Sequence, residues 1–324
     1  MDKIWVLAEQ SDGIPASIVF ELLTAARGFG RAVEAVTWGP GSAVVAQALG
    51  EYGATKVYDL GDIGESLPGP KLAAAIAAQV SSGNTPGAIF VGATYDGRDI
   101  AARLSARLDL PVLTNIVGMR LSDGGLTTEH AIFGGSMVLR AHFTSDGPGI
   151  YLIRAKSFAA EPLAEGEIAD AETVSIEAPD TGTNDAARIV ARHEQERSGP
   201  KLDEAAVVVS GGRGLGAPEN YGLITELARL LNGAPGASRA IVDAGWVPYS
   251  HQVGQTGKTV KPLVYMACGI SGATQHIVGM KAAKNIIAIN KDREAPIFSI
   301  ADLGVVGDVT KVIPRIIEEL KSRQ

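Results

Sequence analysis

The sequence predicts two doubly wound α/β domains, each built on a mainly parallel sheet, and three observations support this fold class. Short β-branched runs alternate with longer amphipathic runs through the first part of the chain, and parallel strands need such long crossover connections. A glycine-rich turn follows an apolar strand at 205–209, where a second set of strands begins. The length of 324 residues exceeds the usual size of one domain, so two hydrophobic cores are expected.

The first domain is expected to alternate strands with helices and then to add strands at one edge. Strands are predicted at 4–8, 32–38, 55–60 and 88–92, and helices at 16–27, 42–49, 71–80 and 99–108. The helical period disappears from Pro111 to Ala155. Glycine turns there separate three alternating runs that are typical of antiparallel edge strands, at 126–133, 136–143 and 150–155.

A charged segment is predicted to join the two domains. Seven acidic residues accumulate between Glu161 and Asp180 with almost no aromatic content, which indicates a solvated, loosely packed connection. The segment ERSGPKLDE, from Glu196 to Glu204, then combines charge with a Gly-Pro pair. We place the boundary here, giving an N-terminal α/β domain at 1–198 and a C-terminal domain at 199–324.

The second domain is expected to begin with the strand at 205–209 and the turn SGGRGLGAPEN. Backbone N–H groups of such a turn can approach phosphate oxygens, and the next helix adds partial positive charge. Gly212, Gly214 and Gly216 give G-x-G-x-G and not the dinucleotide pattern G-x-G-x-x-G, so an ordinary tight turn is an equal alternative. Arg213 inside the turn can pair with a phosphate or simply face solvent.

Further strands of the second domain are expected at 240–242, 263–267, 286–289 and 297–300, with a last helix at 309–321. The ligand crevice of a doubly wound sheet lies beyond the carboxyl ends of its strands. Ser238 and Arg239 precede the first of these runs, where a hydroxyl and a guanidinium can address a phosphate. A loop with one exposed arginine is the alternative.

Two polar clusters flank the strand at 263–267, which is the arrangement that a flat, phosphate-bearing cofactor such as a flavin nucleotide would require. On one side, glycines frame Gln255, Thr256 and Lys258, and free the backbone for close approach. On the other side, Ser271 can cap the next helix, with Gln275 four residues later on the same face. A purely structural cap is the alternative for Ser271.

Three further polar residues are candidates for the same site. His276 can donate to an electron-rich ring oxygen if it is protonated or in the right tautomer, although a structural histidine is the commoner case. Asn290 ends a predicted strand and Asp308 stands at the head of the last helix, where each can bind ribose or adenine groups. A simple N-cap explains Asp308 equally well.

Composition excludes several classes of function. The net charge of −7 offers no excess positive charge for nucleic acid or anionic lipid. Cys268 is the single cysteine, so an intramolecular disulfide and a cysteine-based zinc site are not expected. The start MDKIWVLAEQ does not resemble a signal peptide, and the apolar run at 72–80 is too short to span a bilayer. We therefore expect a cytoplasmic protein without membrane insertion.

The order of the motifs resembles one known family. SGGRGL, GASRA, QVGQTGK, VYMACGISGATQH and AIAIN followed by APIF closely resemble the alpha subunit of electron transfer flavoprotein. The resemblance covers the chain from Ala205 to its C-terminus, and GAIFVGATYDGRDIAARLSARL carries a looser likeness in the first domain. Thr274 departs from the branched apolar residue that is commoner there, which puts local helix packing in doubt.

The resemblance implies a heterodimer with a beta subunit, in which the N-terminal domain packs against the partner and the C-terminal domain binds FAD. It implies backbone contacts from Val253 and Gly254. It also places Arg239 and His276 near the isoalloxazine ring, where positive charge or a hydrogen bond would favour the one-electron reduced, anionic flavin. The residues implied to line FAD are Arg213, Ser238, Arg239, Val253, Gly254, Gln255, Thr256, Ser271, Gly272, Ala273, Thr274, Gln275, His276, Asn290 and Asp308.

Individual roles follow from the same resemblance. Ser238 and Ser271 would meet the pyrophosphate, Thr256 would lie near the reactive ring nitrogen, and Asn290 with Asp308 would reach the adenosine end. Catalytic and metal-binding residues are not expected, because the flavin carries the redox chemistry.

The function implied is electron transport and not turnover of a substrate of the protein's own. Electrons would arrive from acyl-CoA and related flavin dehydrogenases of fatty acid β-oxidation and leave for a membrane quinone oxidoreductase. One alternative is a bifurcating or nitrogen-fixation type complex that oxidises NADH. An alternative of another class is a non-redox module that binds an adenine nucleotide.

Overall fold

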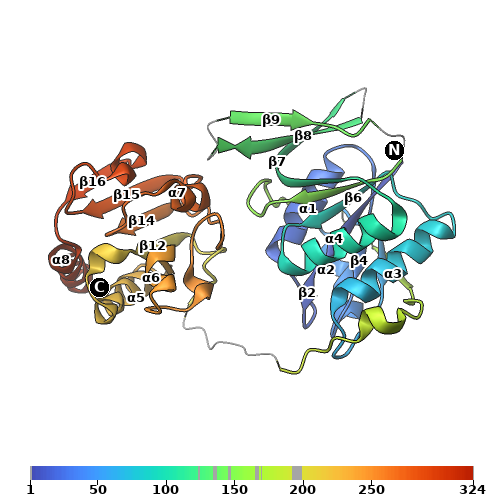
Figure 1. The fold of residues 1–324 in the computed structure, drawn as a ribbon, viewed down its shortest axis with the longest axis horizontal. Helices are drawn as coiled ribbons and strands as arrows, with labels where there is room; N and C mark the ends of the chain where they lie inside the picture. Colours follow the sequence, from blue (N-terminus) through green and yellow to red (C-terminus); the bar gives the residue numbers. More distant parts are fainter. Residues whose placement is uncertain are drawn as a thin grey trace. The chain divides into compact units, whose positions relative to one another are not determined.

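The chain folds as two separate α/β units, Met1–His193 and Glu194–Gln324 (Figure 1). The computed structural model describes residues 2–122, 125–133, 137–144, 147–164, 168, 170–191 and 199–323. Both units carry a mainly parallel sheet, which confirms the predicted Rossmann-like fold class. The predicted boundary between 198 and 199 adjoins residues outside the described part and stays a prediction.

The first unit is built on a nine-stranded sheet in the order β11-β5-β4-β1-β6-β10-β7-β8-β9. Its strands are β1 (Lys3–Ala8), β4 (Ala32–Thr37), β5 (Lys56–Asp59), β6 (Ala88–Gly92), β7 (Val112–Ser122), β8 (Gly125–Ile132), β9 (Met137–Ala141), β10 (Gly149–Ile153) and β11 (Glu172–Ser175). Among the described strands of this sheet, the pairs β7–β8 and β8–β9 are antiparallel and the other neighbours are parallel. A separate hairpin joins β2 (Gln10–Ser11) to β3 (Ile14–Pro15).

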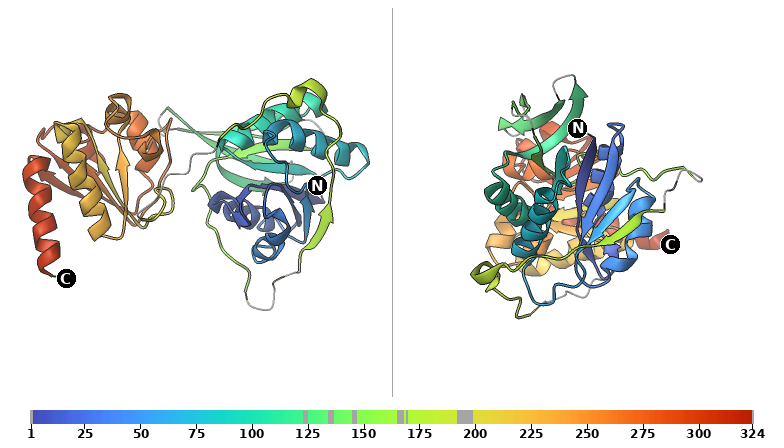
Figure 2. Two further views of the ribbon diagram at one scale, coloured as in Figure 1. Left: turned by 90° about the horizontal axis from the view of Figure 1, so that it is seen from below. Right: turned by 90° about the vertical axis from the view of Figure 1, so that its right-hand side faces the viewer.

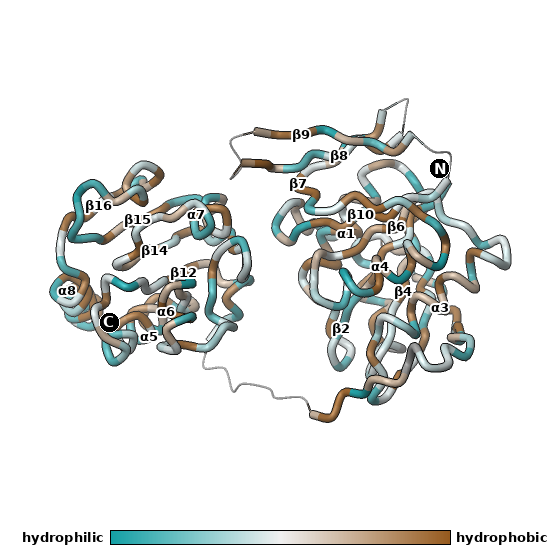
Figure 3. Tube along the Cα trace, viewed as in Figure 1, coloured by the Kyte–Doolittle hydropathy of each residue, from teal (hydrophilic) through white to brown (hydrophobic). Residues whose placement is uncertain are grey.

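Helices flank this sheet on both sides (Figure 2). They are α1 (Ser17–Arg27), α2 (Ala46–Gly50), α3 (Pro68–Ser81) and α4 (Tyr95–Leu108). The core under α1 and α2 is separate from the core under α3 and α4. The central strands are hydrophobic along their length because both faces are covered (Figure 3).

Three predictions for the first unit need correction. The run at 150–155 is not an antiparallel edge strand, because β10 is fully buried and pairs in parallel with both β6 and β7. The acidic connection contains β11, a short exposed strand that pairs with β5 and places Glu172 3.0 Å from Lys56. The helix predicted at 42–49 divides into a 3₁₀ turn, Ser42–Val44, and α2. The antiparallel pairing of β8 and β9 is confirmed.

The second unit has a five-stranded parallel sheet in the order β13-β12-β14-β15-β16. The strands are β12 (Val207–Gly211), β13 (Ala234–Ala237), β14 (Val264–Cys268), β15 (Asn285–Asn290) and β16 (Leu303–Val306). The helices are α5 (Tyr221–Leu230), α6 (Arg239–Asp243), α7 (Thr274–Met280) and α8 (Val309–Ser322). The face covered by α5 and α8 has one core, and the face covered by Met280 and Ile297 has another.

Two strand predictions for the second unit are wrong. The run at 240–242 lies in the helix α6, which buries Ile241, and the strand is β13, four residues of small side chains just before it. The run at 297–300 belongs to the 3₁₀ turn Pro296–Ile300, whose Ile297 packs on the sheet, and the edge strand β16 follows it. Among the described residues, no helix combines the length and apolar character that crossing a bilayer requires.

Candidate cofactor site

The carboxyl ends of all five strands of the second unit meet at one edge of its sheet. β12 and β14 are neighbours in the sheet, and the chain leads from β12 to β13 on one side and from β14 to β15 on the other. The topological switch point, where doubly wound folds bind their ligands, therefore lies between β12 and β14. Arg213, Ser238, Ser271, Asn290 and Asp308 all follow or end strands at this edge. The predicted site residues from five loops therefore share one side of the unit.

The glycine turn after β12 is pressed against the turn after β14. The Gly212 N–H donates to the Cys268 carbonyl and the Gly214 N–H donates to the Gly269 carbonyl, both at 2.9 Å. A Cβ on Gly212 would lie 2.4 Å from the Gly269 oxygen, and one on Gly214 would lie 2.7 Å from the Gly269 Cα. Glycine is thus required for the contact itself, and the bare backbone at the switch point suits the close approach of a phosphate.

Ser238 and Arg239 follow β13 and do not precede a strand, which corrects their predicted place and moves them to the carboxyl edge. The Ser238 N–H donates to the Gly211 carbonyl, and its hydroxyl makes no cap hydrogen bond to α6. The Arg239 Nε lies 3.0 Å from the Asp243 carboxylate one helical turn later, and both side chains are mostly exposed. Arg239 therefore shares its charge with Asp243.

The loop that carries Gln255 and Thr256 is fixed on the start of α7. The Gln255 N–H donates to the Gln275 carbonyl at 2.7 Å, and a Cβ on Gly254 would lie 2.9 Å from that same oxygen. The Val253 N–H donates to the carbonyl of Ala237 at 2.9 Å, which ties the loop to the end of β13. The side chains of Gln255 and Thr256 are exposed and remain available to a ligand.

The segment before α7 differs from the predicted cap. The helix begins at Thr274 with Ala273 as its N-cap and no side-chain cap, so Ser271 lies outside it and does not cap it. The Ser271 carbonyl accepts from the Ile297 N–H at 3.0 Å, and its side chain is exposed at the sheet edge. Gly272 has φ +87°, and a Cβ there would lie 2.3 Å from the Ile297 nitrogen.

His276 is a buried, neutral histidine. The residue is 6% exposed, and its Nε2 lies 2.9 Å from the Tyr265 hydroxyl. Burial lowers its pKa to about 4, against a smaller opposing contribution from the Val253 backbone. The sequence predicts His276 as a hydrogen-bond donor either in its protonated form or as the right neutral tautomer. With this pKa the ring is neutral near pH 7, so the prediction of a protonated donor is wrong.

One nitrogen of His276 remains for a ligand. Burial raises the pKa of Tyr265, so this phenol keeps its proton and can donate to Nε2. Nδ1 then carries the hydrogen of the neutral ring. This atom is buried, and apart from a contact with the Val253 backbone, which opposes the lowering of the pKa, it has no hydrogen-bond partner in the described part of the chain.

Asn290 and Asp308 use their side chains within the fold. The Asn290 amide donates to the Ile270 carbonyl and accepts from the Asp292 N–H, both at 3.0 Å. Asp308 is the N-cap of α8 and accepts from the Thr310 N–H at 2.9 Å, and the two contacts from Thr310 lower its pKa. The N-cap alternative for Asp308 is thus confirmed.

Sequence reasoning missed two polar residues that organise the site. Tyr265 lies in the middle of an apolar strand, and only the fold reveals that it meets His276. Gln252 is 2% exposed, and its Nε2 donates to the Thr256 hydroxyl at 2.9 Å. The polar run HQVGQT was the sequence signal that could have pointed to Gln252.

The described residues fit a nucleotide cofactor better than a metal. Exposed hydroxyls and the buried His276 Nδ1 offer hydrogen-bond donors, and the glycines at the switch point leave the backbone there free of side chains. Within the described ranges, His, Cys, Asp and Glu side chains do not form a cluster that could hold a metal ion.

Comparison with known proteins identifies relatives along the whole chain. Residues 201–281 match the Electron transfer flavoprotein FAD-binding domain, and residues 4–180 match the Electron transfer flavoprotein domain. "Electron transfer flavoprotein subunit alpha" of Mycobacterium tuberculosis (strain ATCC 25618 / H37Rv) is 43% identical, and that of Mycobacterium leprae (strain TN) is 41% identical, each with full coverage of both chains. "Protein FixB" of Clostridium saccharobutylicum is 34% identical over 98% of this chain and 97% of its own.

Proposed function

This chain belongs to the electron transfer flavoprotein family as an alpha subunit, and on that premise we propose that it pairs with a beta subunit and relays electrons through its FAD. FAD is the cofactor of the matched domain. The observation that supports a site at the carboxyl edge is the glycine contact at the switch point, where Gly212 and Gly214 meet Gly269 without room for a Cβ.

We propose that the chain binds and orients the cofactor without an acid or base of its own. FAD, when bound, supplies the redox chemistry, and the fold adjusts its potential. The glycine turn and the hydroxyls of Ser238 and Ser271 would bind the pyrophosphate. The Gln252 hydrogen bond would hold Thr256 in place. His276 would donate from Nδ1 to an electron-rich ring atom, which a neutral imidazole can do without adding charge.

We propose acyl-CoA and related flavin dehydrogenases as electron donors and a quinone oxidoreductase as acceptor. The relatives of 41% and 43% identity, both named as alpha subunits of an electron transfer flavoprotein, support a carrier. The FixB relative of 34% identity supports a second candidate, a complex that takes electrons from NADH. The higher identity to the two relatives named as electron transfer flavoprotein subunits favours the carrier over the FixB type.

The heterodimer tests this function directly. Purified with its beta subunit, the chain is expected to show flavin absorbance and to release FAD on denaturation. An acyl-CoA substrate with its dehydrogenase is expected to bleach the flavin, and NADH alone is not. Bleaching by NADH without a dehydrogenase would replace the proposal with the second candidate.

The Arg239 ion pair gives a further prediction. If Arg239 lies near the flavin ring, Arg239→Ala lowers the flavin midpoint potential by on the order of tens of millivolts, because a positive charge stabilises the reduced anion. Asp243→Asn is expected to raise the potential, because it removes the carboxylate 3.0 Å from Arg239. The control is Arg229→Ala, an exposed arginine in the last turn of α5. Spectroelectrochemical titration measures the flavin midpoint potential of all three variants. Equal potentials for Arg239→Ala and wild type would show that Arg239 does not lie near the flavin ring.

A further inference from the structure

Thr256 of the candidate site is held by two side chains from one short segment. The Gln252 Nε2 donates to the Thr256 hydroxyl at 2.9 Å. The Tyr249 hydroxyl donates to the Thr256 carbonyl. Tyr249 begins the 3₁₀ turn Tyr249–His251, and Gln252 follows this turn directly. The same segment therefore fixes both the side chain and the backbone of Thr256.

The segment that holds Thr256 is itself tied to the loop and to the sheet. Gln252 is buried, and its backbone forms a parallel bridge with Ala237 at the end of β13. Its carbonyl accepts from the Lys258 N–H at 2.7 Å. A Cβ on Gly257 would lie 2.4 Å from that carbonyl oxygen, so a glycine lets the loop close on Gln252. Thr256 thus lies on a loop that is closed on itself and on the sheet.

The Gln252 contact also decides how the Thr256 hydroxyl can bind a ligand. A hydroxyl has one hydrogen to donate and two lone pairs that accept. Because the Thr256 oxygen accepts from the Gln252 amide, the hydroxyl hydrogen is available to donate. A hydroxyl that accepts one hydrogen bond also donates a stronger one. The side chain is exposed, so Thr256 is prepared as a donor to a bound ligand.

The two serine hydroxyls of the candidate site are held less firmly in the described part of the second unit. Ser238 is the N-cap of α6 without a side-chain cap hydrogen bond. Ser271 is tied to the fold through its carbonyl, which accepts from the Ile297 N–H at 3.0 Å, and its side chain is exposed. A group that must be oriented needs further residues that hold it in place. Of these three hydroxyls, the fold orients that of Thr256.

We propose that Gln252 and Tyr249 are positioning residues that aim the Thr256 hydroxyl, as a donor, at an unprotonated nitrogen of the flavin ring. The inference rests on the proposed function, in which FAD binds at this edge and Thr256 lies near the reactive ring nitrogen. A nitrogen with a lone pair accepts from the hydroxyl, and it loses this hydrogen bond when it takes up a proton. The two residues therefore favour a flavin that gains an electron without a proton at that atom.

A double-mutant cycle on the purified heterodimer tests the role of Gln252. Thr256→Val removes the hydroxyl and is expected to disfavour uptake of the first electron about tenfold, which lowers the one-electron midpoint potential by ~59 mV. Gln252→Leu removes the donor to that hydroxyl and is expected to disfavour the same step about fivefold. In the Thr256→Val background Gln252→Leu is expected to have no further effect, because it acts through the hydroxyl. An equal effect of Gln252→Leu with and without the hydroxyl would overturn the proposal.

Tyr249→Phe repeats the test at a half-exposed position, where loss of one oxygen does not threaten folding. It is expected to disfavour uptake of the first electron about twofold when the Thr256 hydroxyl is present, and not in the Thr256→Val background. Thr256→Ser keeps the hydroxyl and is expected to stay near the wild-type potential. Spectroelectrochemical titration measures the midpoint potential of each variant. If neither Gln252→Leu nor Tyr249→Phe changes it, the proposal is wrong.

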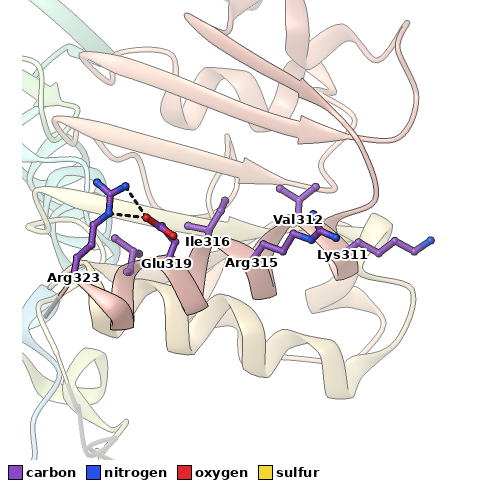
Figure 4. Close-up of a pocket in the computed structure, with 7 residues that line it drawn as sticks. Lys311, Val312, Arg315, Ile316, Glu319 and Arg323 are labelled. Carbon is purple, nitrogen blue, oxygen red and sulfur yellow. Dashed lines mark hydrogen bonds and ion pairs between the residues drawn. The ribbon is translucent and has the colours of Figure 1, made fainter.

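Hydrogen exchange in the flavin-depleted heterodimer tests the same contacts without the cofactor. The peptide that covers residues 253–258 is expected to exchange faster in Gln252→Leu and Tyr249→Phe than in wild type. The control is Glu319→Gln, which removes the carboxylate that accepts from Arg323 at 2.6 and 2.8 Å near the end of α8 (Figure 4). Equal exchange in all variants would show that Gln252 and Tyr249 do not hold the loop, and would overturn the proposal. If the two variants exchange faster but the wild-type heterodimer contains no FAD, the proposed function fails, and with it the role of the two residues at the flavin.

Discussion

Gly212→Ala is expected to weaken FAD binding by about tenfold or more, which corresponds to ~1.4 kcal/mol or more. The added Cβ would lie 2.4 Å from the Gly269 oxygen and 2.7 Å from the Ile270 side chain, so the turns after β12 and β14 must move apart. Gly212 has φ −126° and ψ −173°, which alanine adopts freely. The effect therefore arises from the contact between the two turns and not from backbone strain. Overpacking of this kind also lowers the free energy of unfolding by about 1–3 kcal/mol.

Gly222→Ala is the matched control for this substitution. Gly222 lies in the exposed first turn of α5, and a Cβ there would meet no atom within 4 Å. Alanine at a helical glycine position is expected to be neutral or to stabilise by about 0.5–1 kcal/mol. Titration of FAD into the flavin-depleted heterodimer, followed by fluorescence, compares the dissociation constants. If Gly212→Ala binds FAD as tightly as Gly222→Ala, the turn after β12 does not hold the cofactor.

The second unit is expected to lose about 2 kcal/mol of stability when the pH falls from 6.5 to 5, because of His276. The pKa of this histidine is about 4 in the fold, below its value of 6.5 when exposed. The unfolded chain therefore takes up the proton first. The contribution of neutral His276 to the free energy of unfolding is fully present above pH 6.5 and is lost as the pH falls toward 4. Hydrogen exchange of peptides from β14 and α7 measures this change within the second unit alone.

Two variants distinguish the origin of this acid sensitivity. His276→Gln removes the titrating group. In this variant the loss of stability between pH 6.5 and 5, measured by hydrogen exchange of the β14 and α7 peptides, is expected to disappear. Tyr265→Phe removes the hydroxyl 2.9 Å from Nε2 and is expected to destabilise the unit by about 1–3 kcal/mol at pH 7, since it leaves a buried nitrogen unpaired. An NMR titration of the His276 ring gives the pKa directly. A value near 6.5 in the flavin-depleted protein would contradict the buried, neutral state.

Local sequence patterns gave wrong predictions for a strand without β-branched residues, β13, and for a strand that follows antiparallel strands in the sequence, β10. β13 reads APGA, four small residues, and it forms a strand because it pairs with β12 and not because of its own propensity. The nearby apolar run of α6 attracted the strand prediction, yet its Ile241 serves as the buried face of a short helix. Because Ser238 lies between the two, this misassignment also placed it at the wrong edge of the sheet.

The topology of the first unit shows a similar limit. The run of β10 follows two antiparallel strands in the sequence, so its neighbours suggested a third. In the fold the chain returns to insert β10 between β6 and β7, where both of its faces are buried. A continuous apolar run such as GIYLI is typical of a central parallel strand. The position of a strand in a sheet depends on contacts between distant segments, which a local window does not contain.

The sequence by itself determined the fold class, the family and the cofactor, because alternating periods and a fixed order of motifs are properties of the chain. It also indicated the residue types of the candidate site. Only the tertiary structure decided their states: burial and Tyr265 make His276 a neutral ring, and Ser238 and Arg239 reach the carboxyl edge because β13 pairs with β12. Protonation and pairing depend on which atoms surround a group in space, and residues distant in sequence supply most of those atoms.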